Sequence, residues 1–148
     1  MARQEVKVGI DTNVLVRSFV DDGTAQFMAV ARLMRENQIV ISPSVLLEAE
    51  WVLRETFKLA RDKVADAFET LLGASNVTVL QEDAAVPALK AFRSGCDFAD
   101  AFHWALCPDV DGFMTFDKRF VHRAAALGLR PPVQLVEMAT RKSGRRPP

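Results

Sequence analysis

Short apolar-rich runs alternate with longer segments of helical periodicity along almost the whole chain. Runs rich in apolar residues and bounded by turn residues predict short strands over residues 6–10, 39–41, 77–80, 113–116 and 133–136. Apolar residues three and four positions apart predict helices over residues 14–19, 24–36, 43–58, 61–72, 83–93, 97–106 and 118–127. Strands that alternate with helices indicate an α/β domain with a mainly parallel sheet.

The pattern predicts one domain over residues 1–140, with a sheet of four to five strands flanked by helices. The last residues, 141–148, are rich in Arg and Lys and contain Gly and Pro, so we expect a disordered basic tail there. No run approaches the roughly 18 apolar residues that span a bilayer, and the N-terminal residues do not resemble a signal peptide. The sequence therefore predicts a cytoplasmic protein without a membrane segment.

The composition is that of an ordinary globular domain, with 148 residues, of which 49% are hydrophobic and 26% charged. Cys96 and Cys107 are eleven positions apart, and neither they nor His103 and His122 have the spacing of zinc ligands. We expect two reduced, partly buried thiols and no zinc chemistry.

The zero net charge conceals an uneven distribution. Residues 117–148 contain eight Lys and Arg against two acidic residues, a surplus of six, so residues 1–116 carry a deficit of six. An acidic body with a basic end suits an acidic metal site beside a phosphate-binding edge, although charged runs are often only solvated surface.

Two aspartates follow predicted strands directly. Asp11 ends the first strand and Asp117 ends the fourth, and a helix follows each of them. Each aspartate could simply cap its helix, which stabilises by about 1 kcal/mol. Because the carboxyl ends of parallel strands meet at one edge of a sheet, where ligands bind, the pair also predicts a site.

Three further acids favour the site. Asp97 and Asp100 lie three positions apart on one helix face, although Asp97 could be a cap with Asp100 in the first turn. Glu48 interrupts an apolar stretch, where a carboxylate is costly to bury without a positive partner. Carboxylates that converge without His or Cys select Mg²⁺ or Mn²⁺, and these ions support phosphodiester hydrolysis.

Four segments carry a family resemblance, in the family's order: Ile10-Asp11-Thr12-Asn13, Leu47-Glu48-Ala49-Glu50-Trp51, Asp97-Phe98-Ala99-Asp100 and Thr115-Phe116-Asp117-Lys118. They resemble the motifs of the PIN-domain ribonucleases, and most of all the VapC-type toxins of type II toxin–antitoxin pairs. The resemblance implies a PIN-like three-layer α/β fold. It also implies a metal-dependent endoribonuclease that forms homodimers and is held inactive by a cognate antitoxin protein.

Carried over by position, the resemblance makes Asp11, Glu48, Asp100 and Asp117 the acidic quartet that binds Mg²⁺ or Mn²⁺ and cleaves RNA. Asp97 is then an auxiliary metal ligand. The resemblance also implies that Thr12 and Asn13 belong to a motif segment that supports Asp11, and that Thr115 occupies a polar position beside the metal.

Several residues near the motifs need a choice. Glu50 is two positions from Glu48 and points elsewhere on a helix, so we assign the site to Glu48. The basic residues Arg17, Lys118 and Arg119 are candidates for contacts with RNA phosphates. We expect both tryptophans, Trp51 and Trp104, to lie in the core, and His103 to be structural.

Two alternatives remain open. One is a phosphohydrolase with Asp11 as nucleophile, which normally needs a second aspartate where this chain has Asn13. The other is a non-catalytic RNA- or protein-binding module that keeps the fold. The large apolar residues of predicted helices 43–58 and 61–72 further suggest a surface for an antitoxin segment.

Overall fold

A computed structural model describes residues 6–139, so the predicted tail at 141–148 lies outside the described residues. The strands are β1 (Lys7–Gly9), β2 (Gln38–Ile41), β3 (Val77–Val79), β4 (Phe113–Thr115) and β5 (Val133–Leu135). The helices are α1 (Thr12–Phe19), α2 (Ala25–Glu36), α3 (Pro43–Glu55), α4 (Arg61–Gly73), α5 (Glu82–Arg93), α6 (Phe98–Ala105) and α7 (Lys118–Leu127). The predicted alternation of strands and helices is confirmed.

The helices begin where the sequence provides caps. Asp11, Thr24, Ser42, Asp97 and Asp117 each accept a backbone N–H bond from the first turn of the helix that follows. Ser42 is followed by Pro43, whose fixed φ and missing N–H suit the first helical position. None of the helices within residues 6–139 is long and apolar enough to cross a membrane.

All strand pairings are parallel, as expected, but the strands form two sheets. Strand β2 lies between β1 and β3, with Val8 opposite Ile39 and Ile39 opposite Val77. Strand β4 pairs with β5 in a separate ladder, with Met114 opposite Gln134. The expected single sheet of four to five strands is thus divided into three strands and two. The strand pattern locates each strand but does not specify which edges pair, and most of these strands are only three residues long.

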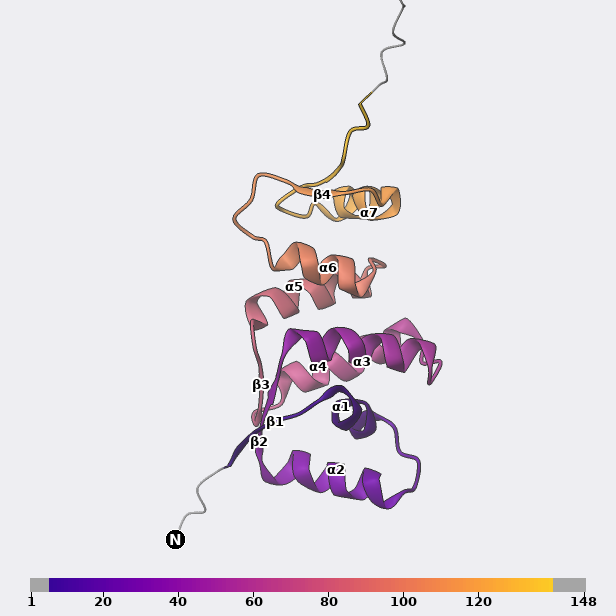
Figure 1. Cartoon of the computed structure of the whole chain (residues 1–148), viewed down its shortest axis with the longest axis vertical. Helices are drawn as coiled ribbons and strands as arrows, with labels where there is room; N and C mark the ends of the chain where they lie inside the picture. Colours follow the sequence, from indigo (N-terminus) through magenta and orange to yellow (C-terminus); the bar gives the residue numbers. More distant parts are fainter. Residues whose placement is uncertain (1–5, 140–148) are drawn as a thin grey trace, which may run out of the picture.

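The helices are layered along the long axis of the molecule (Figure 1). Helix α2 lies at one end, and α7 lies with β4 at the other. The α5–α6 pair lies between α7 and the α3–α4 pair, with β1, β2 and β3 along one side. This order places the beginning of α1 and the beginning of α7 in different layers.

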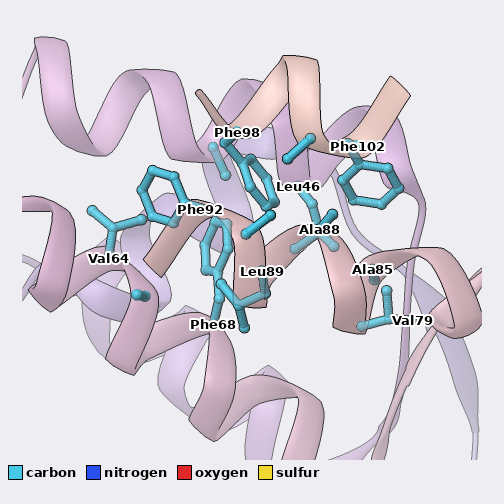
Figure 2. Close-up of a cluster of buried hydrophobic side chains, with 14 of the residues drawn as sticks. Leu46, Val64, Phe68, Val79, Ala85, Ala88, Leu89, Phe92, Phe98 and Phe102 are labelled. Atoms are coloured by element: carbon cyan, nitrogen blue, oxygen red, sulfur yellow. The ribbon is translucent and has the colours of Figure 1, made fainter. Parts of the chain in front are cut away.

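Phenylalanines connect the central layers (Figure 2). The Phe98 ring on α6 lies 5.7 Å from Phe68 on α4, 5.3 Å from Phe92 on α5 and 5.6 Å from Phe102, between ring centroids. All four rings are buried. Such tilted and edge-on contacts add to the burial of apolar area, and they fix α6, which carries Asp100, against α4 and α5.

The two tryptophans differ in how far they are buried. Trp104 is buried and its indole N–H donates to the Pro131 carbonyl at 2.9 Å, as expected for a core residue. The expectation for Trp51 is wrong, because 57% of this residue is exposed on α3. Trp51 directly follows the buried Glu50 in sequence, but consecutive residues of a helix point to different faces.

Candidate functional site

Asp11 lies where the sequence predicts it, after β1 and separated from the strand by Ile10 alone. Its Oδ1 accepts the backbone N–H of Val14 at 3.0 Å and so caps α1. The residue is exposed, and the capping bond uses one of its two carboxylate oxygens. The capping role and a ligand role are therefore compatible.

Asp117 lies between β4 and α7, as the N-cap of α7. Its Oδ1 accepts the backbone N–H groups of Arg119 at 2.9 Å and of Phe120 at 3.1 Å. The Asp117 backbone N–H donates to the Thr115 hydroxyl at 3.0 Å. Thr115 thus holds the backbone of Asp117, and its place beside a metal stays a prediction.

Asp97, Asp100 and Asp117 form an acidic group between α6 and α7. Asp97 Oδ1 accepts the backbone N–H of Asp100 at 3.0 Å. The pKa of Asp100 is raised, first by burial and then by the negative charges of Asp97 and Asp117, with His103 acting in the opposite direction. Asp97 and Asp117 thus both act electrostatically on Asp100, and their negative charges favour a proton or a cation at its carboxylate.

The structure does not gather the whole predicted quartet. Asp11 follows β1 and Glu48 lies on α3, whereas Asp100 and Asp117 belong to α6 and the start of α7. Within residues 6–139, no group of three or more His, Cys, Asp and Glu side chains is placed so that it could hold a metal ion. The chemistry of the four donors suits Mg²⁺ or Mn²⁺, but their arrangement here is not a finished metal site.

Glu48 and Glu50 have opposite environments. Glu48 is exposed on α3, whereas Glu50 is buried, with 4% of the residue exposed. Glu50 accepts a hydrogen bond from Arg54 one turn later, as part of an ion pair. Burial raises the pKa of Glu50, and Arg54 opposes this effect. Glu50 is therefore held by α3 itself, whereas Glu48 remains accessible.

Arg61 is a residue that the sequence analysis missed. At the start of α4, its Nη1 donates to the Phe92 carbonyl at 2.9 Å and to the Cys96 carbonyl at 2.7 Å, and its guanidinium lies 4.6 Å above the Phe92 ring. Cys96 directly precedes Asp97, so Arg61 holds the turn that leads into the acidic group. Partners 31 and 35 residues away leave no local signal in the sequence.

A basic groove follows the acidic group along α7. Lys118, Arg119, His122 and Arg123 line a cavity of about 550 Å³ together with Ser94. Arg123 lies against Gly95, where any added Cβ would collide with its guanidinium. Two of the three predicted RNA contacts, Lys118 and Arg119, thus lie in one groove, whereas Arg17 lies on α1 and pairs with Asp22 at 2.9 Å.

Both cysteines are free, with Cys96 buried and Cys107 half-buried, as expected for reduced thiols. Burial raises the pKa of the Cys96 thiol, so this sulfur stays protonated.

These features define an α/β protein with carboxylates at the ends of two parallel strands and on a neighbouring helix. The model of the PIN domain family matches residues 8–126, which is most of the chain, and the chain belongs to this family. No curated protein matches it. PIN domains are generally nucleases, so membership supports a nuclease role.

The raised pKa of Asp100 gives a first prediction. Asp100→Asn removes a carboxylate that burial and two neighbours disfavour, so the metal-free protein should gain about 1 kcal/mol, or roughly 3 °C in melting temperature, at neutral pH. Because the pKa of Asp100 is raised in the folded state, the wild type loses stability as the pH rises past this pKa. The stability gain of Asp100→Asn over the wild type should therefore vanish at acidic pH, where Asp100 is protonated. Thermal melting in EDTA across pH measures both effects. Asp109→Asn, in an exposed loop, is the control and should change nothing; an equal gain there would contradict this explanation.

Proposed function

We propose that this chain is an endoribonuclease that uses Mg²⁺ or Mn²⁺ and serves as the toxin of a toxin–antitoxin pair in the cytoplasm. The observation that carries the nuclease part is the acidic group of Asp97, Asp100 and Asp117 in a chain of the PIN family that also has Asp11 and Glu48 in the matched region. Carboxylate oxygens without His or Cys suit these two ions.

Each acid has its own part in the proposal. Asp11, Glu48, Asp100 and Asp117 would hold the metal, with Asp97 as an additional ligand. When bound, the metal activates a water molecule and stabilises the leaving oxygen of the phosphodiester. Thr115 keeps Asp117 in place through the bond described above, and Thr12 and Asn13 begin the helix that Asp11 caps. Since no three of these side chains within residues 6–139 are placed to hold a metal ion, the proposal requires them to converge on the bound ion.

The basic groove supplies a reason for RNA to bind next to these acids. Lys118 and Arg119 follow Asp117 directly in sequence, and His122 and Arg123 continue the same groove one turn later. Phosphates that flank the scissile bond would lie along this groove, whose positive charges offset the repulsion from the carboxylates.

A cleavage assay tests the nuclease proposal. Purified protein should cut single-stranded RNA with Mg²⁺ or Mn²⁺ and should stop in EDTA. The metal should also raise the melting temperature of the wild type, because it binds only the folded state, and most of this rise should be lost in Asp100→Asn. A protein that neither cuts RNA nor responds to either metal in melting would contradict the proposal and favour the non-catalytic module, which the lack of an assembled metal cluster in residues 6–139 also favours.

The toxin part rests on an exposed apolar surface. Trp51 on α3 and Phe57 after it are 57% and 43% exposed, whereas Leu53 of the same helix is buried. Exposed aromatic residues of this kind suit an apolar segment of an antitoxin or the second subunit of a homodimer. An Arg of that antitoxin would pair with the carboxylates and compete with the metal.

Co-expression with the neighbouring gene tests the toxin part. The two proteins should purify together, the complex should not cut RNA, and raising Mg²⁺ should partly restore cleavage. Trp51→Ala should weaken the complex but leave cleavage by the isolated chain unchanged. A chain that always elutes alone and fully active beside its neighbour would remove the toxin assignment and leave the nuclease.

A further inference from the structure

A cavity of about 400 Å³ lies between α1 and α2 and includes Asp11 in its wall. Its polar lining comes from Asp11, Asn13, Arg17 and Gln26, and its apolar lining includes Val14 and Val30. This volume lies within the range of roughly 300–1,000 Å³ of small-ligand sites. The cavity is separate from the basic groove, which α7 and Ser94 line.

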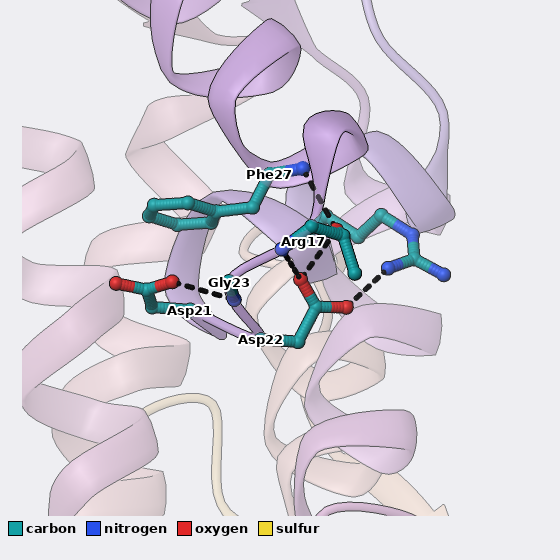
Figure 3. Close-up of polar contacts among 6 residues, drawn as sticks. Arg17, Asp21, Asp22, Gly23 and Phe27 are labelled. Atoms are coloured by element: carbon teal, nitrogen blue, oxygen red, sulfur yellow. Dashed lines mark hydrogen bonds and ion pairs between the residues drawn. The ribbon is translucent and has the colours of Figure 1, made fainter.

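The turn between the two helices holds Arg17 in place before any ligand arrives (Figure 3). Arg17 Nη1 donates to Asp22 Oδ2 at 2.9 Å, while Asp22 Oδ1 accepts the backbone N–H and the hydroxyl of Thr24. The Thr24 hydroxyl in turn accepts the backbone N–H of Phe27, which caps α2. The bonds from Thr24, and then from Arg17, lower the pKa of Asp22, so this carboxylate is charged at neutral pH and can pair with Arg17. A guanidinium held in this way offers its plane and its remaining N–H groups at little entropic cost.

The charges of the lining disfavour a phosphate. Asp22 compensates the charge of Arg17, and Asp11 adds a carboxylate to the wall. Asn13 and Gln26 each bring an amide, which has both a donor and an acceptor for hydrogen bonds. A neutral, planar, polar-edged ligand therefore fits this lining better than an anion does.

We propose that the cavity between α1 and α2 binds one unstacked nucleobase of the RNA, next to the bond that is cut, and so sets the sequence preference of cleavage. This rests on the proposed ribonuclease function, because Asp11 belongs to both the cavity and the acidic quartet. Sequence-specific recognition of single-stranded RNA uses bases that are turned out of the stack, held against flat side chains and read at their edges. Arg17 supplies the flat surface, and the Gln26 and Asn13 amides read the edge.

Gln26 is the residue to change, because it is exposed, lies in the first turn of α2 and is not one of the acids. Gln26→Ala keeps a good helix former there, so folding should be unaffected. A pool of RNA with randomised sequence is cut, and the ends of the products are sequenced. The wild type should show a preference at one nucleotide beside the cut, and Gln26→Ala should reduce this preference at least about fivefold. Gln134→Ala, an exposed glutamine on β5, is the matched control and should keep the wild-type preference.

A binding measurement separates this inference from the nuclease proposal. Fluorescence anisotropy in EDTA with labelled six-nucleotide oligomers of A, C, G or U needs neither metal nor cleavage. The wild type should prefer one of the four oligomers, and Gln26→Ala should lose that preference. If no metal supports cleavage, the nuclease proposal fails and this measurement alone decides the cavity. An identical preference in wild type and Gln26→Ala, or no preference in the wild type by either method, overturns the inference.

Discussion

Glu48→Gln is expected to lower RNA cleavage at least about a hundredfold, whereas Glu50→Gln should keep most of the activity. Glu48 is exposed on α3 and available to a metal, whereas Glu50 is buried and occupied by Arg54. Asp11→Asn and Asp117→Asn should have effects as large as that of Glu48→Gln, because metal binding and water activation depend on the quartet as a unit. Single-turnover cleavage of a labelled RNA at saturating Mn²⁺ measures all four variants.

The comparison between the two glutamates needs a folding control. Glu48→Gln should melt like the wild type, because its side chain makes no hydrogen bond or ion pair with any of residues 6–139. Its inactivity would then be a loss of chemistry rather than of structure. An active Glu48→Gln together with an inactive but folded Glu50→Gln would show that we assigned the site to the wrong glutamate.

Arg54→Met is expected to destabilise the fold by about 3 kcal/mol, or roughly 10 °C in melting temperature. The substitution keeps the apolar stem but leaves the Glu50 carboxylate buried without its cation. The value is at the low end for a buried pair because Arg54 retains 27% side-chain exposure. Urea unfolding at neutral pH measures the loss.

Two further variants show whether the loss comes from an unpaired charge. The double variant Glu50→Met, Arg54→Met removes both charges and should recover most of the stability. Arg32→Met breaks an exposed pair with Glu36, in which the side chains are 71% and 47% exposed, and should cost no more than about 0.5 kcal/mol. If Arg54→Met were as mild as Arg32→Met, or the double variant no better than Arg54→Met, the buried pair would not be what stabilises α3.

The sequence predicts best where the structure depends on near neighbours. Caps such as Asp11 and Asp117 act within three residues, so their places at the starts of α1 and α7 follow directly from the pattern. The choice between Glu48 and Glu50 is partly predictable, because a helix separates them in direction, but the spacing alone does not say which one faces the core.

What the sequence could not predict depends on contacts between distant segments. The bonds from Arg61 to the carbonyls of Phe92 and Cys96, and the cavity that brings Gln26 next to Asp11, exist only after the helices have packed. The division of the strands into two sheets also depends on distant segments, because the pairing of β1 with β2 joins residues more than 30 positions apart. The exposure of Trp51 likewise depends on how α3 packs against the other helices, which helical spacing alone does not specify.

The capping aspartates have a consequence for reading related sequences. Asp11, Asp97 and Asp117 each start a helix, so a descendant that had lost all activity would still benefit from Asp, Asn, Ser or Thr at these positions. Their presence in a homologue therefore says less about activity than it first suggests. Glu48 has no such structural role among residues 6–139, because it is exposed, caps no helix and forms no hydrogen bond or ion pair through its side chain. In an alignment, Glu48 on α3 and Asp100 on α6, neither of which caps a helix, are thus the acids whose retention would separate active members from those that keep only the fold.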